Sequence, residues 1–215
     1  MIELRQEKTE DYFETENVIR EAFWNHYTPA CNDHYLIHLM RDCPAFVPQL
    51  DLVAVDGQKI VGSSMCLRSY IAGDDSRRYT VLSLGPIGVL PAYQKKGIGS
   101  MLIARTKAIA GELGYRGILL CGDPAYYERQ GFFAAETYGI RNAENLYADA
   151  LHACPLYPGA FAEAQGRYYE DPVYNVDENL AEEYDKLFPA KNIVYGTAAQ
   201  RKFEMMLRRV RPYQG

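Results

Sequence analysis

The chain has 215 residues, of which 48% are hydrophobic and 24% charged, and its 23 lysine and arginine residues against 28 aspartate and glutamate residues give a formal net charge of −5. This is the composition of a globular protein that can bury a core without disulfides or metal ions. The acidic balance argues against nucleic acid and membrane surfaces as partners, and it favours small cationic substrates.

Nothing in the sequence indicates export or membrane insertion, so we expect a cytoplasmic protein. Residues 1–8 alternate charged with apolar side chains, and no apolar run approaches the roughly 20 residues that span a bilayer. Five cysteines without a Cys-x-x-Cys spacing favour reduced thiols over disulfides or zinc ligands: Cys31, Cys43, Cys66, Cys121 and Cys154. Cys66 and Cys121 lie in apolar runs and are expected in the core.

The first half of the chain predicts a short strand, two helices and a sheet. The strand is expected at residues 2–4 and the first helix over 9–24, with Thr9 as its N-cap. A second helix is expected between Asp33 and Cys43. Residues 51–90 predict an antiparallel meander, because β-prone runs are separated by turn sequences such as Asp56-Gly57.

The second helix carries two histidines without predicting a metal site. His34 and His38 are spaced to share one helix face, but Tyr35 stands where a zinc hydrolase has a glutamate. We interpret the pair as polar positions on a surface or interface helix.

The second half alternates helices and strands and then becomes weakly patterned. The expected elements are a helix over 97–113, a strand over 118–121 that is buried on both faces, a short helix over 125–130, a strand from Phe132, and late helices near 177–187 and 197–209.

Residues 82–100 predict a strand, a tight turn and the start of a helix. Backbone N–H groups at a helix start lack intrahelical partners, and the helix dipole adds positive potential, so this turn can bind a phosphate. Walker and Rossmann loops do not fit, because no Lys-Ser/Thr pair follows and Leu102 replaces the third glycine. We interpret the turn as a Gln-x-x-Gly-x-Gly pyrophosphate loop: Gln94, Lys95, Lys96, Gly97, Ile98, Gly99 and Ser100. An ordinary glycine-rich turn is the alternative.

The strand before this loop predicts a bulge. Pro86 cannot donate to a sheet, and Gly85 and Gly88 weaken pairing. The freed backbone groups could pair with an extended ligand and donate to an oxyanion. The residues concerned are Ile87, Gly88 and Val89. The alternative is a bulge that serves only sheet curvature.

A second signal is the segment Gly122-Asp123-Pro124-Ala125-Tyr126-Tyr127-Glu128-Arg129-Gln130-Gly131-Phe132. Together, the two motifs resemble those of the GCN5-related N-acetyltransferase (GNAT) family, and the second is similar to that of the YhbS-like bacterial group. The resemblance covers residues 2–155. It implies an α/β (α+β) fold, the acyl-CoA N-acyltransferase (GNAT) fold, with a mixed central sheet flanked by helices in a domain over 1–155. Residues 156–215 would form a C-terminal extension that packs on the same domain.

The resemblance also implies a cofactor and an acid. Residues 94–100 would bind the pyrophosphate of acetyl-CoA, the co-substrate, and the pantetheine arm would enter between the strands that end at Leu90 and Gly122. Tyr127 would protonate the leaving thiolate, a role that suits a phenol. The alternative for Tyr127 is a core aromatic. No metal ion is implied.

The chain departs from the family pattern at the general base. Many members have a glutamate on the strand before the loop, whereas residues 83–86 offer no carboxylate. The amine would lose its proton through water, through another side chain such as Asp123 or His26, or without a base if its pKa is low. Asp123 is also a suitable cap for a helix that begins at Pro124.

The resemblance places the acceptor against Trp24, His26, Tyr27 and Asp123 and against the C-terminal extension. We expect transfer of acetyl to a primary amine of a small molecule or peptide. The alternatives are a CoA-binding sensor module that has lost catalysis, as the missing glutamate suggests, and an acyltransferase for longer acyl groups. The sequence identifies neither the acceptor nor the oligomeric state, and a homodimer is compatible with it.

Overall fold

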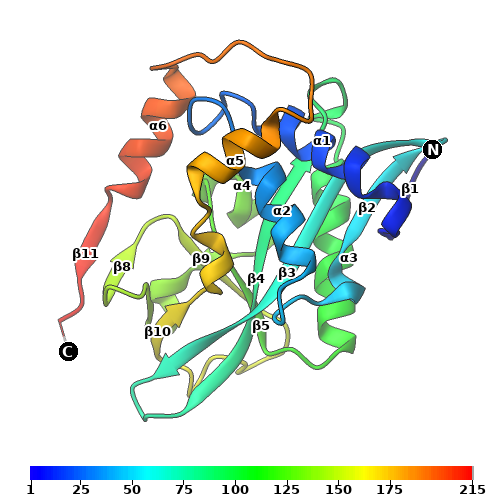
Figure 1. Ribbon diagram of the computed structural model, residues 1–215. Coiled ribbons are helices and arrows are strands. Elements are labelled where there is room, and N and C mark those ends of the chain that lie inside the picture. The colour runs from blue at the N-terminus through cyan, green and yellow to red at the C-terminus, as the bar shows by residue number, and fades with distance from the viewer. Residues whose placement is uncertain (215) are drawn as a thin grey trace.

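The computed structural model describes residues 1–214. A nine-stranded mixed sheet runs through the molecule in the order β1-β2-β3-β4-β5-β9-β6, with β10 paired to both β3 and β7 (Figure 1). The strands of this sheet are β1 (Ile2–Gln6), β2 (Leu52–Asp56), β3 (Lys59–Gly73), β4 (Arg78–Val89), β5 (Gly117–Cys121), β6 (Phe133–Ala134), β7 (Ile140–Arg141), β9 (Leu151–Pro155) and β10 (Gly166–Tyr169). A separate two-stranded sheet pairs β8 (Leu146–Ala148) with β11 (Val210–Pro212).

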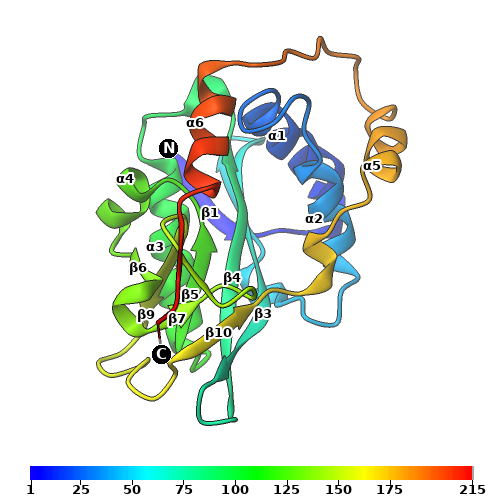
Figure 2. The same ribbon diagram turned by 90° about the vertical axis from the view of Figure 1, so that its left-hand side faces the viewer.

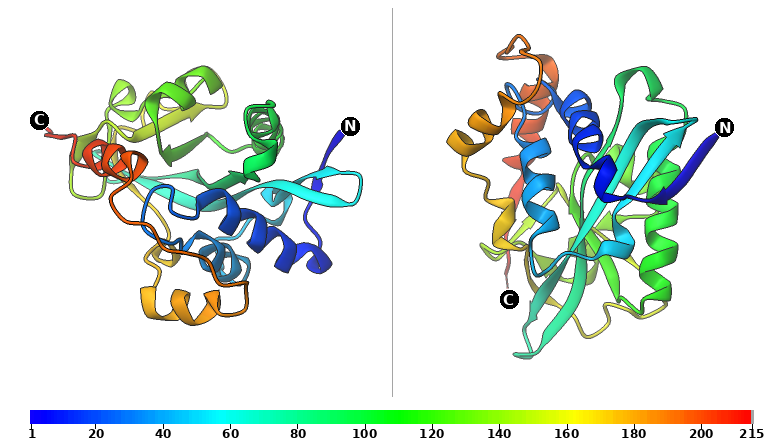
Figure 3. Two further views of the ribbon diagram at one scale, coloured as in Figure 1. Left: turned by 90° about the horizontal axis from the view of Figure 1, so that it is seen from above. Right: turned by 45° about the vertical axis from the view of Figure 1, so that its right-hand side comes forward.

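Helices cover both faces of the large sheet. Figure 2 and Figure 3 show α1, α2 and α5 on one face and α3 on the other. The helices are α1 (Tyr12–Phe23), α2 (Asp33–Arg41), α3 (Ile98–Glu112), α4 (Pro124–Tyr127), α5 (Glu178–Asp185) and α6 (Ala198–Leu207). None of them, within residues 1–214, combines the length and apolar character that crossing a membrane requires.

The core has a layer on each side of the sheet, because alternate residues of a strand face opposite sides. On the α3 face, Leu82 and Leu84 of β4 pack with Ile103 of α3 in one buried cluster. On the other face, Ile19 of α1 packs with Met65 of β3 in a second cluster. The sheet is therefore anchored to helices on both sides, and α1 and α3 are both held close to β4.

The meander predicted over residues 51–90 is confirmed. β2 and β3 form a hairpin whose last pair is Asp56↔Lys59, with Gly57 in the left-handed conformation (φ 66°). The predicted first helix differs at its start, because Thr9–Asp11 form a 3₁₀ turn and α1 begins at Tyr12. Asp11, not Thr9, supplies the polar contact there, since its carboxylate accepts the Lys8 N–H at 2.8 Å.

The described residues after Pro155 contribute two strands and two α-helices. β10 pairs with β3, β11 pairs with β8, and α5 contacts α2. Strands of three or four residues are too short to show a clear alternation, which explains the weak pattern of this region. The division at residue 155 stays a prediction, and Gly215 lies outside the described residues.

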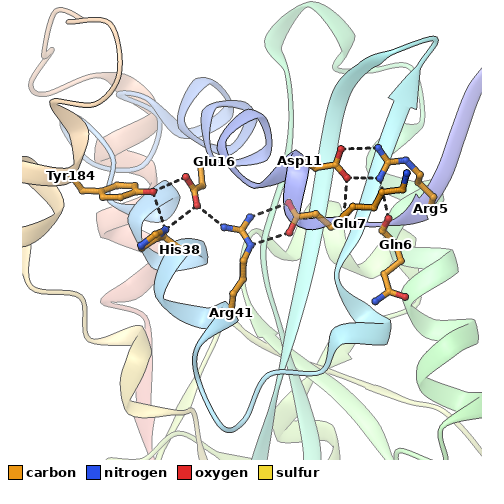
Figure 4. Close-up of polar contacts among 9 residues, drawn as sticks. Arg5, Gln6, Glu7, Asp11, Glu16, His38, Arg41 and Tyr184 are labelled. Carbon is orange, nitrogen blue, oxygen red and sulfur yellow. Dashed lines mark hydrogen bonds and ion pairs between the residues drawn. The ribbon is translucent and has the colours of Figure 1, made fainter.

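A buried network of charges joins β1's end to three helices (Figure 4). Arg41 of α2 donates to both carboxylate oxygens of Glu7 at 3.0 Å and to Glu16 of α1 at 2.5 Å. Glu16 also accepts the Tyr184 hydroxyl of α5 at 2.7 Å and lies 3.2 Å from His38 Nδ1. The network therefore fixes α1, α2 and α5 relative to one another.

The other histidine of α2, His34, also contacts α5. His34 is fully buried, with its Nε2 at 3.1 Å from Asp185 Oδ1. The two histidines thus lie at an interface between helices, as interpreted from the sequence. Within residues 1–214, no three His, Cys, Asp or Glu side chains gather as a metal site requires.

All five cysteines are free thiols. Cys66 is buried as expected, whereas the prediction of a core position for Cys121 is wrong. Cys121 is exposed because β4, the parallel neighbour of β5, pairs with that strand only as far as Leu119.

Candidate active site

The ends of β4 and β5 and the start of α3 border a cavity of about 650 Å³. Every residue predicted to bind coenzyme A lines it except Lys96: Ile87, Gly88, Val89, Gln94, Lys95, Gly97, Ile98, Gly99 and Ser100. The Lys96 ammonium instead donates to the carbonyl oxygen of Ala92 at 2.9 Å. The two separate stretches of the predicted cofactor site thus meet at one cavity.

The glycine-rich turn presents free backbone N–H groups to this cavity. Gly97 precedes α3 in the left-handed conformation (φ 84°), and the first intrahelical bond runs from the Met101 N–H to the Gly97 carbonyl at 3.0 Å. The N–H groups of residues 98–100 therefore lack helix partners. Gln94 ties the turn to β4, since its side-chain amide donates to the Val89 carbonyl at 3.0 Å. Such a helix start can bind an anion without help from side chains.

β4 and β5 separate beside the cavity. The parallel strands share two residue pairs, Leu82↔Ile118 and Ser83↔Leu119. Beyond them, the register between β3 and β4 shifts around Gly85 and Pro86, which confirms the predicted bulge. The edge of β4 that faces β5 therefore has no strand partner over residues 87–89, where it lines the cavity.

Gly88 allows α1 to approach this edge closely. A Cβ at this position would lie 2.9 Å from Ile19 Cδ1 and 3.0 Å from Ala22 Cβ of α1. A larger residue would push α1 away from β4. Helix α1 therefore defines the side of the cavity opposite α3.

Tyr127 lines the cavity from α4. Its ring lies against Gly122, where an added Cβ would be 2.2 Å from the ring, and it meets Phe132 edge-on with centroids 5.7 Å apart. Burial, with a smaller effect from Tyr27, raises the pKa of Tyr127. The phenol therefore keeps its proton at neutral pH and is available as a donor.

Tyr126 covers the glycine-rich turn. A Cβ at Gly99 would lie 2.6 Å from Tyr126 Oη, so a side chain at residue 99 would compete with this hydroxyl for space. The rings of Tyr126 and Tyr127 meet edge-on with centroids 5.0 Å apart. The two adjacent tyrosines thus occupy different parts of the cavity wall.

The loop after α1 directs its aromatic residues in two directions. His26 and Tyr27 line the cavity, whereas Trp24, which we expected at the acceptor, is not among the lining residues. The Trp24 indole donates to the carbonyl of Asn192 at 2.9 Å, and its ring lies 4.4 Å from the Arg20 guanidinium carbon. Trp24 therefore joins α1 to the C-terminal segment.

Helix α6 borders the same loop. The Phe203 ring lies 4.6 Å from the Tyr27 ring, and Lys202 forms an ion pair with Asp123. Asp123 also caps α4, as expected, because its carboxylate accepts the Ala125 N–H at 3.0 Å. The bond with Lys202 lowers the pKa of Asp123, which makes this carboxylate a weak proton acceptor.

His26 differs from Asp123 in its charge state. Burial lowers the pKa of His26, so its ring is neutral at neutral pH. The cavity also includes residues that the sequence analysis did not single out: Ala22, Tyr93, Arg129 and Gln130. Arg129 lies within the Gly122–Phe132 motif, and its positive charge is the sequence signal that could have predicted its place in an anion-binding cavity.

Comparison with known proteins identifies the fold. A GNAT family N-acetyltransferase (YhbS) from Escherichia coli, solved in complex with CoA, superimposes with a TM-score of 0.72 at 20% identity, over 81% of this chain and 92% of that one. A GNAT family acetyltransferase from Brucella melitensis, solved with acetyl-CoA, gives 0.66 at 24% identity, over 81% and 98%. The ribosomal-protein-S18-alanine N-acetyltransferase from Escherichia coli gives 0.51 at 14%, over 73% and 94%.

At these identities the structural likeness shows the fold alone, and no curated protein matches the chain. The family model described as Acetyltransferase (GNAT) family matches residues 3–132, more than half of the sequence. This match includes both motifs and the whole wall of the cavity. The chain therefore belongs to the GNAT acetyltransferase family.

Proposed function

We propose that the protein transfers the acetyl group of acetyl-CoA directly to a primary amine of a small molecule or peptide. The observation that carries the proposal is that a single cavity contains three of the groups the reaction needs. It joins the free N–H groups at the start of α3, the unpaired edge of β4 and the Tyr127 hydroxyl. These three features meet three needs of an acetyl-CoA-dependent transfer: an anion site, a backbone partner and a proton donor.

The residues present fit acetyl-CoA. Its pyrophosphate matches the anion site at residues 98–100, where Lys95 and Arg129 add positive charge to the wall. Its pantetheine arm carries amides that can pair with the unpaired edge over residues 87–89. The solved relatives from Escherichia coli and Brucella melitensis contain CoA and acetyl-CoA, which supports the same choice of co-substrate here.

The chemistry requires no covalent enzyme intermediate. The amine nitrogen attacks the acetyl carbonyl carbon, and the negative charge that develops on the carbonyl oxygen is stabilised by backbone N–H groups of residues 87–89. When the carbon–sulfur bond breaks, the Tyr127 hydroxyl gives its proton to the thiolate. The cavity wall thus supplies an oxyanion donor and an acid.

The acceptor side is aromatic and acidic. Tyr27 lies beside Phe203, and besides burial the negative charges of Asp123 and Asp33 raise the pKa of Tyr27. Aromatic rings and carboxylates attract an ammonium group. A substrate with a primary amine fits this wall better than an anionic one.

Calorimetric titration of the protein with acetyl-CoA, CoA and a longer acyl-CoA tests the co-substrate. We expect acetyl-CoA to bind at one site per chain, with a weaker affinity in Gly99→Val. Absence of acetyl-CoA binding would contradict the proposal. A clear preference for the longer acyl-CoA would identify a different acyltransferase.

A further inference from the structure

β10 brings residues of the C-terminal extension to the centre of the sheet. β2 pairs with β3 only as far as Leu52↔Ser64, and past the isolated bridge Phe46↔Leu67 that edge is open to another strand. β10 occupies it with an antiparallel register that ends at Tyr169↔Tyr70 (Figure 2). The residue after this strand is Glu170. Glu170 thus lies one strand away from β4, the strand that offers no carboxylate at residues 83–86.

The side chains next to Glu170 connect it to β4. The Tyr168 hydroxyl donates to Glu170 Oε1 at 3.5 Å and is also hydrogen-bonded to Ser83 Oγ of β4. Since Tyr168 gives its one hydrogen to Glu170, Ser83 is the donor in the bond to Tyr168, and Ser83 Oγ lies 2.9 Å from Ser69 Oγ of β3. A chain of hydroxyl groups therefore runs from the Glu170 carboxylate to Ser83, one of the positions at which the family glutamate is missing.

This chain of hydroxyl groups ends where β4 and β5 separate. Ser83 forms the last pair with β5, at Leu119, and Cys121 follows two residues later on the same face of that strand. From the extension, the Tyr174 hydroxyl donates to the carbonyl of Gly85 at 3.0 Å, within the β4 bulge. Glu170 and its neighbours thus border the same separation of strands as the cavity.

Glu170 is accessible to solvent yet surrounded by protein. Glu170 and Cys121 are both exposed, and burial nevertheless raises the pKa of the carboxyl and of the thiol, the latter to about 12. Both properties together are typical of groups that line a recess. The titratable groups facing Glu170 are Tyr168 from its own strand, Tyr174 from the following turn and Cys121 from β5. A glutamate whose pKa is raised is a better proton acceptor than an ordinary exposed one.

We propose that Glu170 is the general base of the reaction and replaces the glutamate that β4 lacks. The inference rests on the proposed function. Glu170 takes one proton from the substrate ammonium, directly or through one water, and the freed lone pair forms the carbon–nitrogen bond. The nitrogen then loses a second proton, which restores the Tyr127 hydroxyl after the thiolate has left with the electrons of the carbon–sulfur bond. The products are the amide, CoA thiol and one proton that Glu170 releases to solvent.

The other candidate bases are less suited. Asp123 is engaged by Lys202 and by the cap of α4. His26 is neutral and lines the cavity, but it belongs to the loop after α1, whereas Glu170 is connected to β4 itself. The variant His26→Gln is therefore included as a direct competitor in the test.

The test compares two nucleophiles that differ in basicity. An alkyl primary amine is protonated at neutral pH and needs a base, whereas methoxyamine is already neutral and does not. With acetyl-CoA, we expect Glu170→Gln to lower kcat/KM for the alkyl amine by roughly 10²-fold or more and to change the methoxyamine rate little. Raising the pH should restore the alkyl amine rate. The control Glu163→Gln, at an exposed residue that pairs with Arg77, should match wild type.

Equal losses with both amines would assign Glu170 a structural role and overturn the proposal. A wild-type rate in Glu170→Gln together with a loss in His26→Gln would also overturn it, because His26 would then be the base. A second readout needs no turnover. The carboxyl-carbon NMR signal that is lost in Glu170→Gln should titrate at a higher pH than an ordinary glutamate. Titration at an ordinary glutamate value would contradict the proposal even if the protein binds acetyl-CoA, whereas absence of acetyl-CoA binding would contradict the proposed function instead.

Discussion

At the scale of single residues, the position of Tyr127 separates chemistry from packing. Its ring packs against Gly122 and Phe132, and its hydroxyl is the group assigned to the leaving thiolate. Tyr127→Phe keeps the ring and removes the proton donor. We expect kcat to fall by roughly 10² to 10⁴ with acetyl-CoA affinity nearly unchanged.

Steady-state kinetics with calorimetry check this expectation. Tyr115→Phe is the matched control, because Tyr115 packs against the core cluster on the α3 face and does not line the cavity. A wild-type kcat in Tyr127→Phe would return Tyr127 to the role of a core aromatic. The slow hydrolysis of acetyl-CoA offers the same comparison before an acceptor is known, because the same thiolate leaves.

Gly99 and Gly111 form a matched pair on α3. A side chain at residue 99 would enter the cavity near the Tyr126 hydroxyl, whereas a Cβ at Gly111 meets nothing within 4 Å. We expect Gly99→Val to weaken acetyl-CoA binding at least tenfold, roughly 1.4 kcal/mol, with the fold retained. Gly111→Ala should bind normally and stabilise the protein by about 0.5–1 kcal/mol, because alanine is the better helix former. Calorimetry and urea unfolding measure the two effects, and equal affinity in both variants would remove the anion-site interpretation.

At the scale of elements, the C-terminal segment determines how the loop after α1 lies. The Gln200 side chain of α6 is buried and donates to the carbonyls of Asn25 at 3.2 Å and Val194 at 2.9 Å. Asn25 in turn accepts the Val194 N–H at 3.0 Å through its side chain. Helix α6 therefore holds the loop that carries Tyr27 into the cavity.

Gln200→Ala tests this dependence. Two carbonyl groups lose a buried partner, so we expect the free energy of unfolding to fall by about 1–3 kcal/mol. The KM for the amine should rise more than the dissociation constant for acetyl-CoA, because the affected loop faces the acceptor. Met205→Ala, at an exposed position of the same helix, should change neither the free energy of unfolding nor the KM for the amine. An unchanged KM for the amine would show that α6 does not shape the acceptor site.

The sequence predicted elements whose signals are local. The hairpin at Gly57 and the bulge at Gly85 and Pro86 follow from turn and strand chemistry within a few residues. It did not predict β10, because its pairing with β3 joins distant short segments. Nor could it orient Trp24, whose indole is fixed by a carbonyl far along the chain. The same limit applied to Glu170, which reaches β4 only through the fold.

At the scale of the whole molecule, buried carboxylates couple stability to pH. Asp51 is 3% exposed and faces Glu7, which belongs to the network of Figure 4. Burial, followed by contact with Glu7, raises the pKa of Asp51 from 3.8 to about 9. The folded protein thus holds a proton that the unfolded chain releases. A raised pKa gives stability that is complete below the unfolded pKa and is lost as pH rises towards the folded value.

We therefore expect Asp51→Asn to lose less stability than wild type between pH 6 and pH 9. The difference per pH unit approaches ~1.4 kcal/mol for one proton, because the amide stays neutral throughout. Urea unfolding at both pH values measures it. Parallel pH dependence in the two proteins would show that Asp51 is ionised in the folded state.

The reaction proposed for this chain is the acetylation of a primary amine. The direct measurement is the release of CoA thiol from acetyl-CoA across a panel of alkyl, polyamine, amino-acid and peptide amines, with mass spectrometry of the acceptor. We expect thiol release that depends on one class of amine, equals the amount of acetylated product and falls in Tyr127→Phe. Tight binding of acetyl-CoA with no amine-dependent release across the panel would contradict it and would identify a CoA-binding module without catalysis.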